Sequence, residues 1–209
     1  MTYCSVEDVR RVYEPDQDAP DSVYQSAIDA AVGQIDEFCG RSFGQTVGDV
    51  REFPAELDFL GAGRRAAMDI DDVVPVDSPA AVTDVRVETK VDLSDDDDEA
   101  WEVQDSGWWF GPRTPKDGWP YTELVVSSPS VWSGRFVRVT ADWGWPSVPA
   151  QVQRACLMSS ARIMLHEQSI LGVQSSGEFG TVQSFPRPDP DTARMLRPFK
   201  KSFLLSKWD

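Results

Sequence analysis

The stretch Val139-Thr140-Ala141-Asp142-Trp143-Gly144-Trp145-Pro146-Ser147-Val148-Pro149 marks the point where the chain changes from strand to helix. Leading into it, residues 135–140 alternate between polar and apolar side chains, which is typical of a half-buried strand. At its end, Val148 and Pro149 can open a helix, because proline is tolerated in the first helical turn. The junction therefore predicts a sheet that is followed by a long helix.

The helix after the junction is expected to run to about Gln168 and to be apolar over much of its circumference. A helix of this kind is typically buried in a helical core or between partners. Met158 and Leu165 widen the apolar face, which makes them candidates for a subunit interface. The main face is marked by residues at helical spacing, which are Val152, Cys156, Ser159 and Ile163.

Two further helices are predicted near the N-terminus. Ser5 can cap the first, with Asp8 placed as in a capping box. The second begins at Asp21 or Ser22 and ends before Gly40, which is well placed as the residue after the C-cap. Its apolar residues share one face because they recur at four-three spacing, and they are Tyr24, Ile28, Ala31, Ile35 and Phe38.

The region between these helices reads as strands separated by turns. Alternation predicts strands at 82–88, 121–126 and 135–140, with short ones at 101–104 and 108–110. We therefore expect an α+β chain in which a small antiparallel β-sheet or barrel is inserted between helices. The expected segments are N-terminal helices at 1–46, an inserted β region at 47–146, a long helix at 147–172, and a C-terminal tail at 173–209 with a short helix after Asp189-Pro190.

Charge is distributed unevenly along the chain. The net charge is −15, which argues against a surface that wraps nucleic acid. Between Asp49 and Asp105 there are 18 acidic and 5 basic residues, whereas Arg187 to Asp209 has 6 basic and 3 acidic ones. An acidic middle and a basic tail suggest two surfaces with different partners, although acidic loops that only keep the protein dissolved explain the middle equally well.

Export and membrane insertion are not expected from the sequence. Residues 1–7 have neither a basic head nor an apolar stretch, and no window is apolar enough for a membrane span. The cysteines Cys4, Cys39 and Cys156 are far apart and form no zinc pattern. We interpret them as reduced core residues in a cytosolic protein.

Two short segments match the residue pattern of a catalytic or a cofactor-binding motif but lack the structural context that the motif requires. Residues 40–44 read G-R-S-F-G, but a nucleophile elbow needs a strand before the serine and a helix after it. Here the predicted order is reversed, and the lone His166 lies in an apolar helix. Residues 61–66 match a loose dinucleotide fingerprint, but strand-like sequence follows where a helix is required, so a hairpin turn is the better interpretation. We predict no enzyme activity and no cofactor.

Residues 95–99, D-D-D-D-E, form the strongest acidic run in the chain. Calcium loops space their ligands and place a glycine at the turn, so this run does not fit one and no metal site is predicted. The simplest interpretation is a solvated loop. A functional interpretation is that copies of Asp95, Asp96, Asp97, Asp98 and Glu99 line a channel and repel DNA phosphates.

The adjacent Trp108 and Trp109 must face opposite ways if they lie on a strand. Either one ring is exposed or both faces of the strand are covered, one of them by another subunit. Because tryptophan is enriched in interface hot spots, both are candidates for a subunit interface. A strand buried on both sides within one chain is the equally plausible alternative.

Taken together, four segments resemble the phage head-to-tail connector (adaptor) family, whose members form a ring beneath the portal. They are the first helix at 5–10, the helix end Phe38-Cys39-Gly40-Arg41-Ser42-Phe43, the strand-to-helix junction at 139–149, and the glycine-containing stretch before Asp189-Pro190 with its basic terminus. Residues 47–132 carry little likeness. These motifs are structural rather than catalytic.

The resemblance implies a helical bundle with an inserted sheet, and a homo-oligomeric, dodecameric ring in the neck of the virion. The implied partners are the portal and the next neck protein or tail, with DNA passing through the channel unbound. The basic, apolar tail suits docking on the portal through Arg194, Arg197, Phe199, Lys200, Lys201, Phe203, Leu204 and Trp208. The alternatives are another neck protein, such as a stopper or tail terminator, and an acidic binding module.

Overall fold

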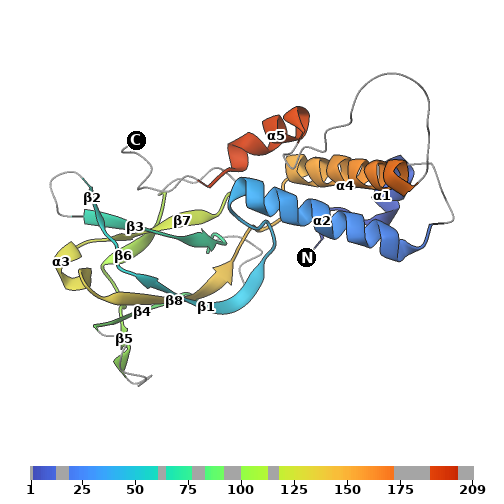
Figure 1. Ribbon diagram of the computed structural model, residues 1–209. Coiled ribbons are helices and arrows are strands. Elements are labelled where there is room, and N and C mark those ends of the chain that lie inside the picture. The colour runs from blue at the N-terminus through green and yellow to red at the C-terminus, as the bar shows by residue number, and fades with distance from the viewer. Residues whose placement is uncertain are drawn as a thin grey trace. The chain divides into compact units, whose positions relative to one another are not determined.

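The computed structural model describes residues 2–12, 19–60, 65–76, 83–91, 100–112, 118–171 and 189–201, and for 166–171 it describes the backbone alone. The chain forms two compact units. The helical unit comprises residues 1–43 and 148–201, and the β unit includes residues 44–147. The class is therefore α+β, as the sequence predicts (Figure 1).

Among its described residues, the helical unit contains the α-helices α1 (Val6–Val12), α2 (Asp21–Cys39), α4 (Ala150–Leu171) and α5 (Pro190–Leu196). A 3₁₀ turn, Arg197–Phe199, follows α5. Helix α4 packs against α2 and α5, and α1 contacts both α2 and α4. The buried side of α4 is rotated from the predicted face, since Val152, Ala155, Cys156, Ser160 and Met164 are buried, whereas Ser159 and Ile163 are half-buried.

Three predicted helix ends are confirmed, whereas α4 extends to Leu171 rather than ending near Gln168. The Asp8 amide donates to Ser5 Oγ at 3.1 Å, and the Ser5 amide is 3.4 Å from Asp8 Oδ2, which forms the capping box. Gly40 ends α2 in the left-handed conformation (φ 64°). Asp189 caps α5 by accepting from the amides of Asp191 and Thr192. Its carboxylate also pairs with Arg162 of α4 at 2.6 Å, which fastens α5 to α4.

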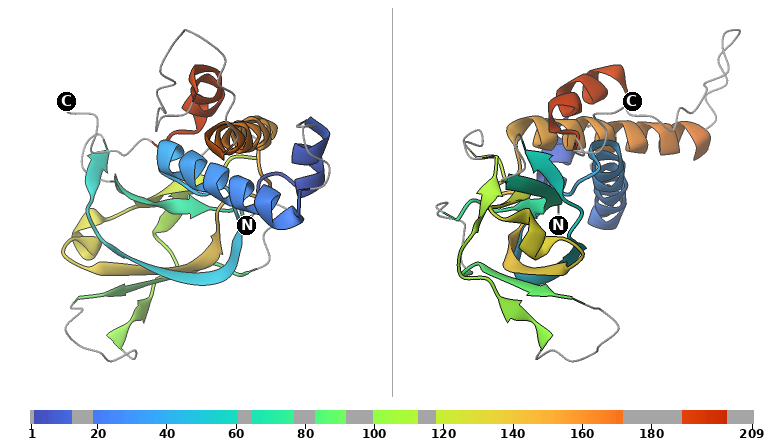
Figure 2. Two further views of the ribbon diagram at one scale, coloured as in Figure 1. Left: turned by 45° about the vertical axis from the view of Figure 1, so that its right-hand side comes forward. Right: turned by 90° about the vertical axis from the view of Figure 1, so that its left-hand side faces the viewer.

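In the β unit, the sheet is antiparallel and runs in the order β5-β4-β8-β3-β7-β6, with β1 paired to β8 and β2 to β3. Both views of Figure 2 show the strands curling round into a half-barrel rather than lying flat. The strands are β1 (Thr46–Pro54), β2 (Asp58–Leu60), β3 (Arg65–Val73), β4 (Arg86–Lys90), β5 (Glu102–Val103), β6 (Trp108–Gly111), β7 (Tyr121–Val126) and β8 (Phe136–Trp143).

The side chains inside the curl form the core of the β unit. Met68, Ile70, Leu124, Val137 and Val139 are buried there from three neighbouring strands. Trp132 joins them from the short helix α3 (Pro129–Trp132), in a segment that the sequence predicts as a turn. The burial of Trp132 explains why this segment is helical rather than an irregular turn, because a single helical turn brings the indole into the core.

Several strands differ from the sequence prediction, which assigns no strand ranges to β1, β2 or β3. β1 is missing from it because none of its residues is buried, so the strand has little apolar alternation. β4 begins at Arg86 rather than near residue 82. The Thr83 amide instead donates to the buried Asp142 carboxylate at 3.2 Å, so a side chain takes the place of a strand partner there.

Tyr3 links the N-terminal segment to the end of α2. Its hydroxyl donates to Asp36 Oδ1 at 2.5 Å and accepts from the Phe43 amide at 2.8 Å. Burial, and then the hydrogen bond to Asp36, raise the pKa of Tyr3 well above its usual value. The folded protein therefore keeps this proton at a pH where the unfolded chain has lost it.

We expect this proton to contribute to alkaline unfolding. Above pH ~10 the unfolded chain releases it and the folded chain does not, so the free energy of unfolding falls by up to ~1.4 kcal/mol per pH unit from this group. Tyr3→Phe is expected to be less stable at pH 7, because Asp36 and the Phe43 amide lose a partner, but to lose stability less steeply above pH 10. Urea unfolding from pH 8.5 to 11.5 measures the slope; equal slopes in both proteins contradict the assignment.

Candidate functional site

The G-R-S-F-G motif lies between α2 and β1, so a helix precedes Ser42 and a strand follows it. This order is opposite to that of a nucleophile elbow and agrees with the predicted helix end and exit turn. The Ser42 hydroxyl is 3.2 Å from the Tyr3 hydroxyl, in the cluster at the end of α2. The side chain of His166 lies outside the described residues.

The dinucleotide-like motif links β2 to β3. These strands are antiparallel neighbours, with Leu60 opposite Arg65, as a hairpin requires. Because a strand follows the glycines and no helix begins there, the motif lacks the context in which a pyrophosphate is bound. Residues 61–64 themselves are not among those described.

The described side chains contain no candidate metal site. Among them, no three His, Cys, Asp or Glu residues lie close enough together to bind a metal ion. The acidic run 95–99 falls outside them. In the same described part of the chain, no helix combines the length and apolarity needed to cross a bilayer.

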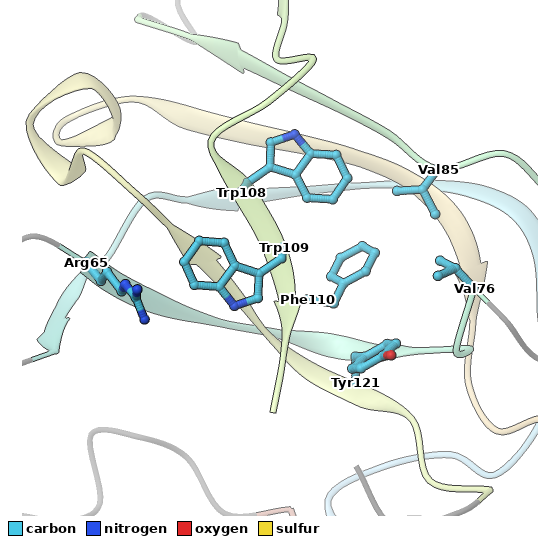
Figure 3. Close-up of a pocket in the computed structure, with 7 residues that line it drawn as sticks. All are labelled: Arg65, Val76, Val85, Trp108, Trp109, Phe110 and Tyr121. Carbon is cyan, nitrogen blue, oxygen red and sulfur yellow. The ribbon is translucent and has the colours of Figure 1, made fainter. Parts of the chain in front are cut away.

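A pocket of about 600 Å³ opens on the β unit (Figure 3). Most of its lining is aromatic or aliphatic, with one cationic side chain at the edge. The residues are Arg65, Val76, Val85, Trp108, Trp109, Phe110 and Tyr121. The volume and the apolar lining are those of sites that take a small ligand or a side chain of another protein.

The two tryptophans of this pocket lie on opposite sides of β6 (Figure 3). Trp108 packs edge-on against Phe110, with ring centroids 5.6 Å apart, and its indole N–H donates to the Gln104 carbonyl at 2.6 Å. Trp109 faces Arg65, whose guanidinium carbon is 5.5 Å from the ring centroid. Both indoles are half-buried, so each is partly covered within the chain and partly open.

Helix α4 carries the second candidate surface. Leu165 is 54% exposed and Met158 is half-buried, so both lie off the buried side of the helix. An exposed leucine by itself needs no explanation. With Met158 it gives α4 an apolar strip one heptad long, which is the spacing of residues that meet a neighbouring helix.

The expected docking tail is only partly available to a partner. Arg194, Arg197 and Lys200 are exposed, and Lys201 is half-buried. Phe199 is a correction, because it is only 5% exposed and packs edge-on against Phe43 with centroids 5.8 Å apart. It therefore belongs to the core of the helical unit and is not free to enter a partner. Phe203, Leu204 and Trp208 lie outside the described residues.

Several carboxylates of the acidic middle segment face arginines of the same unit. Arg51 lies 3.3 Å from Asp49 and 2.9 Å from Asp71, and Arg138 is 2.8 Å from Glu52. These pairs are partly exposed, so each contributes little to stability. They reduce the local negative field of this part of the β unit.

Comparison with known proteins adds no relative. No protein-family model matches the chain, and no curated protein matches it either. A function for this chain therefore has to be inferred from its geometry.

Two groups of residues escaped sequence reasoning. The sulfurs of Cys4 and Cys156 lie 2.9 Å apart although 152 positions separate them in the chain. Tyr3 and Asp36 likewise meet only through folding. No periodicity or spacing in the sequence signals either contact, because each joins segments that are distant in the chain.

Proposed function

We propose that this protein is a structural head-to-tail adaptor of a tailed phage. It forms a ring on the portal in the virion neck and has no catalytic role. DNA passes through the ring without being bound.

The observation that carries the proposal is the order in which the chain builds its units. Residues 1–43 start the helical unit, the antiparallel sheet lies within residues 44–147, and residues 148–201 return to the helical unit. This is the helix–sheet–helix order implied by the resemblance to the adaptors. In the proposal, α1, α2 and the long α4 act as the helical bundle of that family.

The candidate surfaces supply the contacts that a ring needs. A ring uses two different faces of each subunit, one of which docks on the other face of its neighbour. We assign the strip of Met158 and Leu165 on α4 to one face, and the pocket with Trp108 and Trp109 to the other. Apolar and aromatic anchors of this kind supply most of the energy of an interface.

The acidic composition suits a channel. Phosphates are repelled by carboxylates, so DNA slides past an acidic wall without sticking to it. We place the acidic run 95–99 on this wall. The exposed Arg194, Arg197 and Lys200 then remain for an acidic groove on the portal.

The first test is the native mass of the chain, alone and mixed with the portal encoded by the same genome. We expect a ring, or a portal complex that holds several copies of the chain. A monomer that does not bind the portal would contradict the proposal. Tight capture of a different, basic protein by that monomer would favour the acidic binding module.

Leu165→Glu is expected to prevent the ring and leave the monomer folded, because the side chain is 54% exposed and loses no buried contact. Burying a glutamate in the interface costs at least ~2 kcal/mol for each contact, and a ring repeats that cost at every subunit. Val131→Glu is the matched control, since Val131 is 51% exposed but lies in α3 of the β unit. Native mass and circular dichroism are compared; equal assembly by both variants argues against this face.

Portal docking is tested by removing residues 202–209. A cut at Asp189 is unsuitable, because it also removes α5 and the buried Phe199. The shorter chain is expected to keep the fold and the ring but to bind the portal at least ~10-fold more weakly, as the loss of one or two apolar anchors implies. Unchanged portal affinity would move the docking site to Arg194, Arg197 and Lys200.

The runner-up function is another neck protein, either a stopper or a tail terminator. On this alternative the chain is not expected to bind the portal directly. The same native-mass experiment separates the two, because only the adaptor assignment predicts a complex of this chain with the portal alone.

A further inference from the structure

A thiol pair joins the N-terminal segment of the helical unit to helix α4. Cys4 lies in the segment before α1, and Cys156 lies in the first half of α4. Their sulfur atoms are 2.9 Å apart, and both are free thiols. A disulfide requires an S–S distance of about 2.05 Å, so an approach of about 0.9 Å is enough to form the bond.

The surroundings give the two thiols different roles. Cys4 is partly exposed, whereas Cys156 is fully buried. A hydrogen bond from Cys156 lowers the pKa of Cys4, and a further one from Ser160 acts in the same direction. The interaction with Cys4, followed by burial, raises the pKa of Cys156. Cys4 is therefore the thiol that an oxidant reaches and that gives up its proton more readily, and Cys156 lies buried beside it.

We propose that Cys4 and Cys156 form a reversible dithiol–disulfide site that closes on exposure to a peroxide and fastens the N-terminal segment to α4. The site is independent of the adaptor assignment, since it depends on two residues inside the helical unit. In a reducing cytosol it stays open, and in oxidising surroundings it closes.

The reaction balances with hydrogen peroxide as the oxidant. The Cys4 thiolate attacks one peroxide oxygen, the O–O bond breaks, and Cys4 becomes a sulfenic acid while hydroxide leaves. The Cys156 sulfur then attacks Cys4 Sγ, the S–S bond forms, and a second hydroxide leaves. The protons of the thiols convert both hydroxides to water. Two electrons pass from the sulfurs to the peroxide, and a dithiol reductant reverses the change.

The third cysteine serves as an internal control. Cys39 is 1% exposed at the end of α2, and burial raises its pKa to about 11. In the described structure it has no hydrogen bond to a second thiol. It is therefore expected to react neither with peroxide nor with the other two cysteines.

The experiment treats the full chain with hydrogen peroxide and compares it with protein kept in dithiothreitol. We expect a mass lower by two hydrogen atoms, a peptide cross-linked between residues 4 and 156, and a melting temperature raised by roughly 5–10 °C. Cys39→Ser is expected to respond as the parent does, and Cys4→Ser to show no cross-link and no shift. Cys4 is the chosen position because its partial exposure lets serine replace it without disturbing the core.

Three outcomes would overturn the proposal. They are a chain that keeps all its thiols at peroxide concentrations that oxidise free cysteine, a cross-link that includes Cys39, and a Cys4 that stops at sulfinic acid without bonding to Cys156. Cys156→Ala provides the second variant; if it folds, its Cys4 is expected to accumulate as the sulfenic acid, which a dimedone adduct reports by mass.

Discussion

Gly144→Ala is expected to destabilise the β unit by at least ~3 kcal/mol. A Cβ atom at this position would overlap the carbonyl oxygen of Gly44, which belongs to backbone that cannot move aside easily. The residue also has φ +103°, which is unfavourable for a residue with a side chain. Its amide donates to the Asp72 carbonyl at 2.7 Å, so a shift of the chain away from Gly44 breaks that bond.

Gly134→Ala is the matched control. Gly134 also has positive φ (+75°), but no atom lies within 4 Å of the place that a Cβ would occupy, so alanine there meets only the backbone strain. That strain costs about 1 kcal/mol. Urea unfolding of the two variants separates the clash from the strain. Equal losses would mean that Gly44 moves away freely and that the close approach is unimportant.

Trp143→Ala is expected to lose about 3–5 kcal/mol of unfolding free energy. The indole is completely buried, its N–H donates to the Asp49 carbonyl at 2.8 Å, and its ring contacts Phe53 at a centroid distance of 5.7 Å. Trp143 is paired with Thr46 of β1 and Val73 of β3, so it lies where the curled sheet brings three strands together. Removing it leaves a cavity at that junction.

Two further variants test how much of this loss comes from the indole hydrogen bond and how much from burial of the ring. Trp143→Phe keeps a ring but leaves the Asp49 carbonyl without its donor, and we expect an intermediate loss of about 1–3 kcal/mol. Trp109→Ala is expected to cost less than Trp143→Ala because Trp109 is only half-buried. Denaturant midpoints, with the slope checked for two-state unfolding, measure all three. A larger loss for Trp109 than for Trp143 would contradict the assignment of the core.

The strongest sequence predictions rested on local signals. Ser5 with Asp8, Gly40 and Asp189 mark helix ends, and each acts within a few residues of itself, so the sequence contains the whole interaction. The strand at 121–126 was predicted with its observed limits because it is rich in β-branched and aromatic residues and turn residues flank it. The α+β class followed from the change in hydrophobic periodicity, which is helical near both ends of the chain and strand-like between them.

The strands with weak apolar patterns were harder to predict. Asp69, Asp71 and Asp72 interrupt the apolar pattern of β3, so this sequence reads as strand and turn rather than as one long strand. In the structure Asp71 pairs with Arg51 at 2.9 Å, and Asp72 accepts from the Trp145 indole at 3.1 Å. Carboxylates can occupy a strand when such partners face them. Those partners come from β1 and from beyond β8, so the local sequence of β3 does not reveal them.

By itself, then, the sequence determined the capped helix ends, the α+β class and several of the strands, because these depend on neighbours in the chain. It also showed that the catalytic-looking motifs lack the local context of working sites. The tertiary structure alone decided that Phe199 is core, that Trp108 and Trp109 share a pocket with Arg65, and that Cys4 meets Cys156. Each of these contacts joins residues far apart in the chain, and only the packing of apolar surface brings such residues together.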